Sequence, residues 1–580
     1  MKKSTLTGAV SAALLGVLMI VGSIHAKPIP RFDWVTVVNN NDRIPDSPGE
    51  RTFNSYNQPS VNQDGLVVFR ARSRGGSEQG PPTHGIYTRD MAVFNSNIIR
   101  ILDRTTQVPH PNNLVTTFVE TPSFPRIDQD SDTIATRGNH PPVWNYVIGT
   151  DPDTGEVIQT RTGTTGIYAN PFGDLITAGS KLGDIEDFYF YEVPEEFPNT
   201  RFEVFPGAPA VTGGNIIAFK GNYTVEGIGK TGVYYRVLAD DDTGGSWPAM
   251  LIANNTDTMI PGTDTVFGST SPPSAADGQM VFAGFDNEED PTLGGIYLAP
   301  LLDQPPLSTL VSIGGQVPGE LASETFTGLG EGAAFDGRFV GFWGSWGGAT
   351  RTVRLYCAEE GNRDRIAYCN RNLVCADTGE TLGDTNSICD ETGCYQVREV
   401  PVNQGFFVHD IDTRRAWIVA KTGADFDDFL FWNYSGMTPC AGSSGHSEEG
   451  AEDDGEPARW RSSAFVAVSG NGATFNAAFK ARAGVLVDGV YVNPVDGIYI
   501  GRWPGPGRTV DVEPLLDTTM NGQTLDPEAP VGSTITELGI EREGLRGRWL
   551  TVNASMGIEG GSEEDGMAGI YLTELPRNRR

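Results

Sequence analysis

The residues best suited to chemistry are a histidine, a tyrosine and an arginine at related positions of a repeated pattern. Arg137 and His140 stand together in "TRGNHPPVWNY", and Tyr223 takes the position of His140 in the next copy. An arginine neutralises a carboxylate and acidifies the neighbouring proton. A histidine or tyrosine can then remove that proton while the other protonates the leaving oxygen. The trio predicts β-elimination from a carboxylated sugar; the alternative is that His140 holds the Pro141-Pro142 turn.

Lysines and arginines also gather at matching positions of this pattern. The stretch "VVFRARS", residues 67–73, places Arg70 and Arg72 inside an otherwise apolar strand. We predict that substrate is bound by residues close to the small residue of each copy: Arg70, Arg72, Lys220, Trp343, Trp346, Lys480, Arg482 and Asn553. The formal net charge is −32, so a cationic centre in an acidic shell would attract an anionic ligand. The two tryptophans would stack on sugar rings. The alternative is that the cations extend to solvent or pair with acids on adjoining repeats.

The pattern that carries these residues occurs seven times. Each copy has a turn, a short β-branched or aromatic run and then a small residue, as in "PSVNQDGLVVFRARS" at 59–73. The small residues are Ala71, Gly138, Gly221, Gly284, Gly344, Ala481 and Ala554. Most copies continue into a strand containing G-I-Y or G-V-Y and then into a further strand. Repeats of several short strands are typical of a propeller or a solenoid.

The ends of the chain distinguish these two architectures. The last copy stops at "GIYLTELPRNRR" without its final strand, and "FDWVTVVNNNDRIP" at 32–45 resembles the missing strand. Such a strand would close a ring and remove exposed sheet edges, whereas a solenoid needs caps at both ends. We predict an all-β fold, a seven-bladed β-propeller spanning 28–580 as a single domain. We expect the strand with the small residue to be the innermost of each blade, and the small residue to face the packing between blades.

The first 26 residues have the pattern of a signal peptide. Lys2 and Lys3 precede an apolar run from Leu6 to Val21, which is short for a membrane anchor and contains glycine. We therefore expect a secreted or periplasmic protein that does not insert into a membrane. Removing the two lysines changes the net charge from −32 to −34. Such an acidic chain repels nucleic acid, and we expect a monomer.

The six cysteines all lie within a predicted insertion at 357–460 in the fifth copy. An even number of cysteines in an oxidising compartment predicts three disulfides, with their pairing left open. A zinc site would need paired C-x-x-C spacing, which is absent. The run "SGHSEEGAEDDGEP" in this insertion predicts a solvated loop. A structural calcium ion there is the alternative, and no other cofactor is expected.

The repeat "PS-x-N-x-x-G-x-V-x-F-x-A … GIY" resembles that of secreted bacterial β-propeller proteins, and its plan is similar to that of the ulvan lyases. In that family a histidine, a tyrosine and an arginine near the centre of a seven-bladed propeller cleave a sulfated, uronate-containing polysaccharide. The resemblance implies His140, Tyr223 and Arg137 as catalytic residues, Lys220 as a further neutralising group, and an acidic, ulvan-like polysaccharide as substrate. The strongly negative chain departs from what a polyanionic substrate would favour.

A second hypothesis is a non-catalytic propeller that binds a glycan or a protein at the cell surface. The two hypotheses differ in geometry. A lyase needs His140, Tyr223 and an arginine to converge on one substrate position. Side chains that point into separate blade interfaces would favour binding without cleavage.

Overall fold

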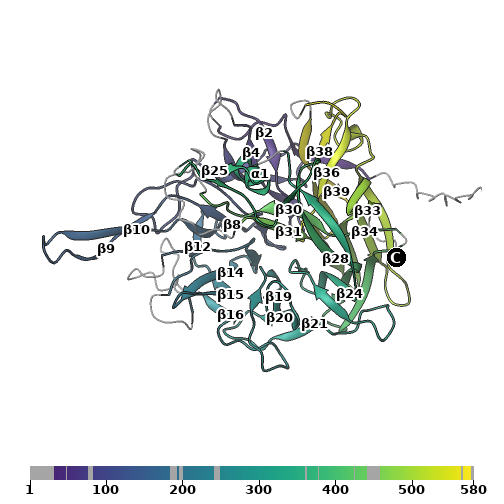
Figure 1. Ribbon diagram of the computed structural model, residues 1–580, viewed down its shortest axis with the longest axis horizontal. Coiled ribbons are helices and arrows are strands. Elements are labelled where there is room, and N and C mark those ends of the chain that lie inside the picture. The colour runs from purple at the N-terminus through teal and green to yellow at the C-terminus, as the bar shows by residue number, and fades with distance from the viewer. Residues whose placement is uncertain are drawn as a thin grey trace, which may run out of the picture.

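The protein is a seven-bladed β-propeller, as predicted (Figure 1). The structure, a computed structural model, describes residues 32–576 except 48, 76–81, 183–192, 195–199, 241–247, 360–361, 377, 424, 441–456 and 563–565. The predicted signal peptide and nearly all of the acidic run lie outside the described residues. No helix in the described part of the chain is long and apolar enough to cross a membrane.

The first four blades follow one another along the chain. Blade one contains β2 (Phe53–Tyr56), β3 (Ser60–Val61), β4 (Leu66–Ser73), β5 (His84–Asp90) and β6 (Ile99–Asp103). Blade two contains β7 (Arg126–Ile127), β8 (Ile134–Asn139), β11 (Thr165–Ala169) and β12 (Ile176–Ser180). Blade three contains β13 (Ala210–Thr212), β14 (Ile216–Val225), β15 (Ile228–Val237) and β16 (Met250–Asn254). Blade four contains β17 (Ser269–Thr270), β18 (Ser274–Ala276), β19 (Gln279–Phe285), β20 (Gly294–Pro300) and β21 (Ser308–Ser312).

The last three blades complete the ring. Blade five contains β22 (Phe326–Leu329), β23 (Ala334–Phe335), β24 (Phe339–Tyr356), β27 (Ile388–Cys389), β28 (Cys394–Asp410) and β29 (Arg415–Lys421). Blade six contains β32 (Val466–Asn471), β33 (Thr474–Val487), β34 (Val490–Trp503) and β35 (Asp511–Asp517). Blade seven contains β36 (Thr534–Gly539), β37 (Leu545–Arg546), β38 (Trp549–Gly557), β39 (Met567–Glu574) and β1 (Trp34–Asn39).

The N-terminal strand closes blade seven, as the sequence predicts. Strand β1 pairs antiparallel with β39, so that Trp34 lies opposite Thr573 and Asn39 opposite Gly569. The pairing gives β39 a hydrogen-bonded neighbour on both sides, since β38 pairs with its other edge. Closure therefore covers an edge that would otherwise template association with another chain.

The strand containing the small residue is the second of each blade, not the innermost as expected. The short strands before it, β3, β7, β13, β18, β23, β32 and β37, contact one another in turn around the whole ring. Ser60 and Val61 illustrate why the expectation was wrong. The segment that reads as a turn is itself a strand, because these two residues pair with Val68 and Val67. Arg70 and its counterparts consequently stand one strand further from the axis.

The small residue does face the packing between elements, as expected. A Cβ added to Gly138 would lie 2.6 Å from the Phe118 ring, closer than carbon atoms approach each other. In blade one, the rings of Phe53, Phe69 and Tyr87 pack together, and similar aromatic groups occur in blades three to six. Alternation along each strand sends these rings to one side, so large and small residues interdigitate between the sheets.

Charged side chains fill the centre of the ring. Arg126 of β7 donates to Glu541 across 2.6 Å, and the two side chains are 2% and 1% exposed. Arg542 donates to the carbonyls of Pro272 and Pro273 in blade four, at 3.0 and 2.9 Å. The segment from Glu541 to Arg546 thus links blade seven to opposite parts of the ring. Its charges are paired or hydrogen-bonded, which a buried charge requires.

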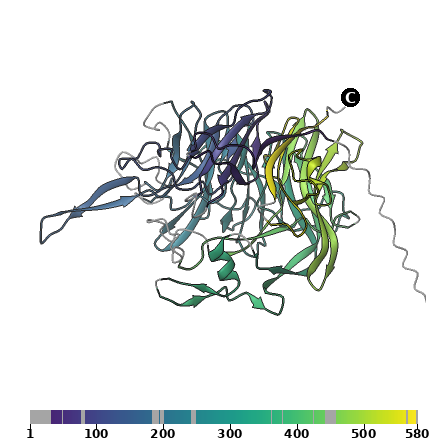
Figure 2. The same cartoon turned by 90° about the horizontal axis from the view of Figure 1, so that it is seen from above.

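The region 357–460 contributes to two structures. Residues Cys394–Asp410 and Arg415–Lys421 are strands of blade five. The remaining described elements, which we call the cap, are α1 (Arg363–Cys369), β25 (Leu373–Val374), β26 (Thr381–Leu382), β30 (Phe431–Ser435) and β31 (Arg459–Ser463). Figure 2 shows α1 on one side of the propeller.

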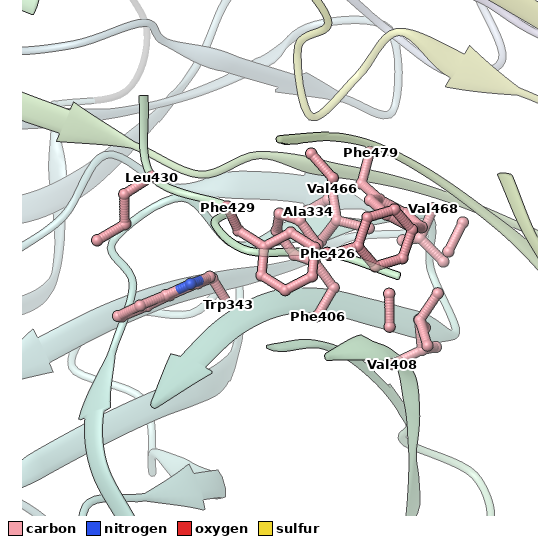
Figure 3. Close-up of a cluster of buried hydrophobic side chains, with 14 of the residues drawn as sticks. Ala334, Trp343, Phe406, Val408, Phe426, Phe429, Leu430, Val466, Val468 and Phe479 are labelled. Carbon is pink, nitrogen blue, oxygen red and sulfur yellow. The ribbon is translucent and has the colours of Figure 1, made fainter. Parts of the chain in front are cut away.

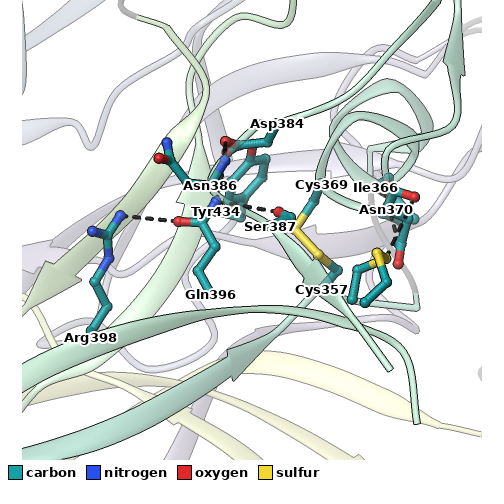
Figure 4. The surroundings of a disulfide bond; sticks show 12 residues. Cys357, Ile366, Cys369, Asn370, Asp384, Asn386, Ser387, Gln396, Arg398 and Tyr434 are labelled. Atoms are coloured by element: carbon teal, nitrogen blue, oxygen red, sulfur yellow. Dashed lines mark hydrogen bonds between the residues drawn. A yellow bond between two sulfur atoms is a disulfide. The ribbon is translucent and has the colours of Figure 1, made fainter. Parts of the chain in front are cut away.

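Three disulfides form, as the cysteine count predicts; two hold the cap, and the third links β27 to β28 of blade five. They join Cys357 to Cys369, Cys375 to Cys440 and Cys389 to Cys394. Beside the first disulfide, Asp384 accepts hydrogen bonds from Tyr434 and Gln396, both at 2.7 Å (Figure 4). The small apolar core of the cap is thus reinforced by covalent links and a buried polar cluster.

Candidate functional site

The cap marks one face of the propeller, which we call the capped face. It is attached where the second strand of blade five leads into the third, and where blade five leads into blade six. Blades are related by rotation about one axis, so the corresponding connections of the other blades leave the same face. The projecting hairpin β9–β10 (Trp144–Thr150 and Val157–Thr162) follows the second strand of blade two (Figure 1). Functional residues on propellers are expected where such connections are long.

His140 is a buried residue of the core between blades one and two. It is 3% exposed, and its ring packs near Phe118 and Tyr168. Its Nδ1 lies 2.8 Å from the Pro141 carbonyl oxygen, which can only accept, so Nε2 accepts from the Tyr168 hydroxyl at 2.7 Å. Burial lowers the pKa of His140 to about 4, against the smaller effect of the bond to Pro141. The imidazole is neutral at pH 7, and both of its nitrogens are engaged.

The structure places Tyr223 in a different interface. It is 1% exposed in the core between blades two and three, where it packs edge-on against Phe202 and lies 3.3 Å from the Thr256 hydroxyl. Arg137 is half-buried and donates to the Phe205 carbonyl at 2.8 Å. His140 and Tyr223 therefore point into separate blade interfaces, which is the geometry that favours binding over cleavage by this trio.

The two predicted sugar-stacking tryptophans are packed in hydrophobic cores. Trp343 is buried in the cluster between blades five and six and donates to Gln404 at 3.3 Å (Figure 3). Trp346 is buried against Phe407 in the core between blades four and five. Trp343 is 9% and Trp346 5% exposed, so neither ring presents a face to a sugar. Asn553 is half-buried in β38, opposite Gly539.

The two predicted cations of blade one differ in exposure, and only Arg72 is open to the capped face. Arg72 is exposed and donates from Nε to the Ser55 hydroxyl at 2.7 Å, which orients its guanidinium. Arg70 lies deeper, between blades one and two. It donates to Asn57 at 3.0 Å and to the Thr121 carbonyl, and it lies 3.7 Å from Glu120.

Sequence reasoning missed His84, which stands directly opposite Arg72 in the β4–β5 pairing. Its Nδ1 is buried and has no hydrogen-bond partner among the described residues. Burial, followed by the charges of Arg70, Arg72 and Arg104, lowers the pKa of His84 to about 4. A neutral histidine therefore lies within a group of arginines. His84 directly precedes "GIY", and the strand before it carries Arg72. That pattern could have indicated that the two side chains lie opposite each other.

The predicted cations of blade six are paired with an acid. Arg482 donates to both carboxylate oxygens of Asp496, at 2.7 and 2.9 Å. Lys480 lies 3.9 Å from Asp496 and 3.9 Å from the centre of the Phe431 ring in the cap. These side chains join the cap to the propeller. They pair with an acid, but it belongs to β34 of the same blade and not to an adjoining blade as the alternative expected. The charge of Lys220 in blade three instead helps to lower the pKa of Glu288 in blade four.

The cap reaches across to blade four. Arg459 of β31 forms an ion pair with Glu288 at 2.6 Å, and Phe431 of β30 packs on Lys480 and Arg482 of blade six. The β30–β31 hairpin therefore spans the capped face between two blades that are not neighbours, and Figure 1 shows it near the middle of the ring. Within the described ranges, no group of three or more histidine, cysteine, aspartate or glutamate side chains could hold a metal ion.

A shallow groove also lies at the outer rim, between blades one and two. Its volume is about 520 Å³, and its lining includes Ile99, Arg100, Pro109, Asn170 and Leu175. It is separate from the cations of the capped face, because β6 and the β11–β12 turn form its walls.

Comparison with known proteins adds fold-level likenesses only. No family model and no curated protein match the chain. Solved structures that align with it include Trypanosoma rangeli sialidase, with 12% identity and a TM-score of 0.32, covering 82% of this chain and 60% of that one. This chain thus spans less than two thirds of that structure.

Two further solved structures align over most of both chains. Trypanosoma rangeli sialidase in complex with sialic acid has 11% identity and a TM-score of 0.30, covering 96% of this chain and 94% of that one. Fructan 1-exohydrolase IIa from Cichorium intybus in complex with 1-kestose has 8% identity and a TM-score of 0.22, with coverages of 93% and 97%. Both structures are of carbohydrate-active proteins, but similarity this low says nothing about the ligand of the present chain.

Proposed function

We propose that the protein is a secreted carbohydrate-binding propeller that recognises an acidic polysaccharide on its capped face. The observation that supports this most directly is the exposed, oriented guanidinium of Arg72, with Arg70, Arg104 and His84 close by. A planar guanidinium matches a carboxylate or sulfate in shape and charge. In a chain of net charge −32, such a group of cations focuses an anionic ligand on one place.

Binding without cleavage is favoured by the arrangement of the predicted catalytic trio. His140 and Tyr223 are buried in different interfaces, and the hydrogen bonds of His140 fix its tautomer inside the core. A general base must come within hydrogen-bond reach of the proton that it removes. Neither residue can do so without opening a blade interface.

The proposal is tested by isothermal calorimetry with ulvan, polygalacturonate and alginate, and with neutral dextran as the control ligand. We expect binding to at least one acidic polymer, weakening as salt is added, and none to dextran. Arg72→Ala should weaken binding by about three- to tenfold, because it removes a hydrogen-bonding charge. Arg43→Ala removes the same charge from an exposed ion pair with Glu50 and serves as the matched control. Binding to no acidic polymer at physiological salt would refute the proposal.

A second candidate is β-elimination at the same place, with His84 as the base. The observation that favours it is a neutral, half-buried imidazole opposite the exposed Arg72 in the β4–β5 pairing. An arginine on the uronate carboxylate would acidify the proton that the histidine removes. Ultraviolet absorbance of new carbon–carbon double bonds measures this reaction. Loss of the signal in His84→Gln, with binding retained, would establish it, and a signal lost only in His140→Ala would return the base to His140.

A further inference from the structure

A second group of cations surrounds a single carboxylate, that of Glu288. Arg459 of the cap donates to it at 2.6 Å. Partial burial raises the pKa of Glu288, but the hydrogen bond from Arg459 and the charges of Arg459, Lys220 and Arg461 outweigh burial and lower it. These four residues come from blade three, blade four and the cap, so the fold assembles three cations around one acid.

The alternation of the cap hairpin explains why its arginines face the propeller. In the β30–β31 pairing, Ser435 lies opposite Arg459 and Phe431 opposite Ser463, so Phe431, Arg459 and Arg461 share one face. Phe431 contacts blade six and Arg459 contacts blade four, which orients this face toward the ring. The opposite face carries Trp460 and Tyr434, which pack into the core of the cap.

Glu288 is held in place by a hydrogen-bonded loop between β19 and β20. Asp286 accepts from the backbone of Thr292 and Leu293 at 2.9 and 3.0 Å, and Asn287 donates to the Asp290 carbonyl at 2.8 Å. The ion pair itself remains open to solvent, since Arg459 is 38% and Glu288 49% exposed. A polymer can therefore reach Arg459 without opening a core.

We propose that Glu288 occupies the place of an anionic group of the ligand, and that a carboxylate or sulfate of an acidic glycan replaces it against Arg459, Lys220 and Arg461. This inference rests on the proposed function and adds a second subsite to it. A glutamate and a uronate carry the same charge and accept the same bidentate hydrogen bonds from arginine. An exposed ion pair contributes little to stability, so its exchange for a ligand group is readily reversible.

The test compares Glu288→Gln with a matched substitution elsewhere. The pair Arg548–Glu574 also has a separation of 2.6 Å, and its side chains are 38% and 47% exposed. Glu288→Gln is expected to tighten binding about two- to fivefold, the usual range for one exposed charge pair, while Glu574→Gln leaves it unchanged. The probes are polygalacturonate for carboxylate, dextran sulfate for sulfate, and dextran as the neutral polymer. The probe that shows the gain identifies the chemistry of the ligand group.

Arg459→Ala separates this explanation from simple release of the cap. Both Glu288→Gln and Arg459→Ala break the same ion pair, so cap release would shift affinity in the same direction in both variants. The proposal predicts opposite directions, with weaker binding in Arg459→Ala. Equal effects of Glu288→Gln and Glu574→Gln, or shifts in one direction for both cap variants, would overturn it.

The two proposals can fail separately. If wild-type binding is lost in Arg72→Ala but unchanged in Glu288→Gln, the binding function stands and the Glu288 subsite is wrong. If neither the wild-type protein nor Glu288→Gln binds either polyanion, the polysaccharide-binding function and the subsite are both wrong.

Discussion

Removing Arg126 from the centre of the ring should destabilise the propeller strongly. Its partner Glu541 is 1% exposed, and one carboxylate oxygen of Glu541 has no hydrogen-bond partner among the described residues. Arg126→Met would leave that carboxylate buried with only Arg542, 3.7 Å away, to compensate its charge. Breaking a buried pair from one side costs about 3–5 kcal/mol, and we expect a loss of unfolding free energy in this range.

A double variant tests whether the loss of unfolding free energy comes from the unpaired charge of Glu541. Arg126→Met with Glu541→Leu removes the closest pair and replaces it with apolar groups of similar volume, which is often nearly neutral. It leaves Glu543, which lies 3.9 Å from Arg126 and is 4% exposed, without that partner. Urea unfolding followed by tryptophan fluorescence would measure all three variants against the wild-type protein. The double variant should recover part of the loss seen in Arg126→Met, because only the charge of Glu543 is then left without Arg126. Equal losses in the single and double variants, or a loss below about 1 kcal/mol in Arg126→Met, would refute the reasoning.

Three further outcomes follow from packing, titration and cross-linking. Gly85→Ala should lower the unfolding free energy by about 1–3 kcal/mol, because its Cβ would lie 2.6 Å from a tyrosine hydroxyl; Gly149→Ala, with open space around it, should change little in the same thermal melts. His140 has a pKa of about 4 when folded and 6.5 as the unperturbed value, so the unfolded chain binds more protons between these limits. Stability should therefore fall by about 3 kcal/mol as pH drops from 6.5 to 4, and His140→Gln should show a correspondingly smaller fall in urea titrations. Replacing Cys375 and Cys440 with serine opens a link across 65 residues. This should cost the cap about 4 kcal/mol, seen as faster proteolysis of the cap while the propeller still melts at its own temperature.

The blades could be predicted from the sequence because each repeat contains the small and aromatic residues that pack its own sheet. The glycine or alanine of the second strand recurs in all seven copies and the tyrosine of G-I-Y or G-V-Y in six of them, so the number of blades could be predicted. The N-terminal segment that resembles the missing last strand predicted the closure. The order of strands within a blade could not. A two-residue strand such as Ser60–Val61 has no periodicity of its own and reads as part of a turn.

The candidate site was only partly predictable, for a related reason. Arg70 and Arg72 stand out because they interrupt an apolar strand, and alternation places both on the same side of the sheet. Which of the two is exposed could not be predicted, because Arg70 is covered by contacts with Thr121 and Glu120. The burial of His140 depends on Tyr168, whose hydroxyl reaches it from another strand. Similarly, Glu288 gains its cations from blade three and from the cap, elements that are distant in sequence. Contacts of this kind appear only once the chain is folded.

The pairing of β1 with β39, which we call the seam, brings the two ends of the ring together. The position in the ring at which the chain starts is therefore not fixed by the sheets themselves. Trp34 and Thr573 are paired neighbours, although the whole propeller separates them along the chain. Joining the ends with a short linker and cutting between two other blades would move the seam without altering any sheet, as circular permutation does in proteins with adjacent termini. For the chain as it stands, the last blade can be completed only when strands from both ends are present together. Segments of the chain that appear one after another during synthesis would therefore fold as an open arc, with one sheet edge exposed until the last strands are made.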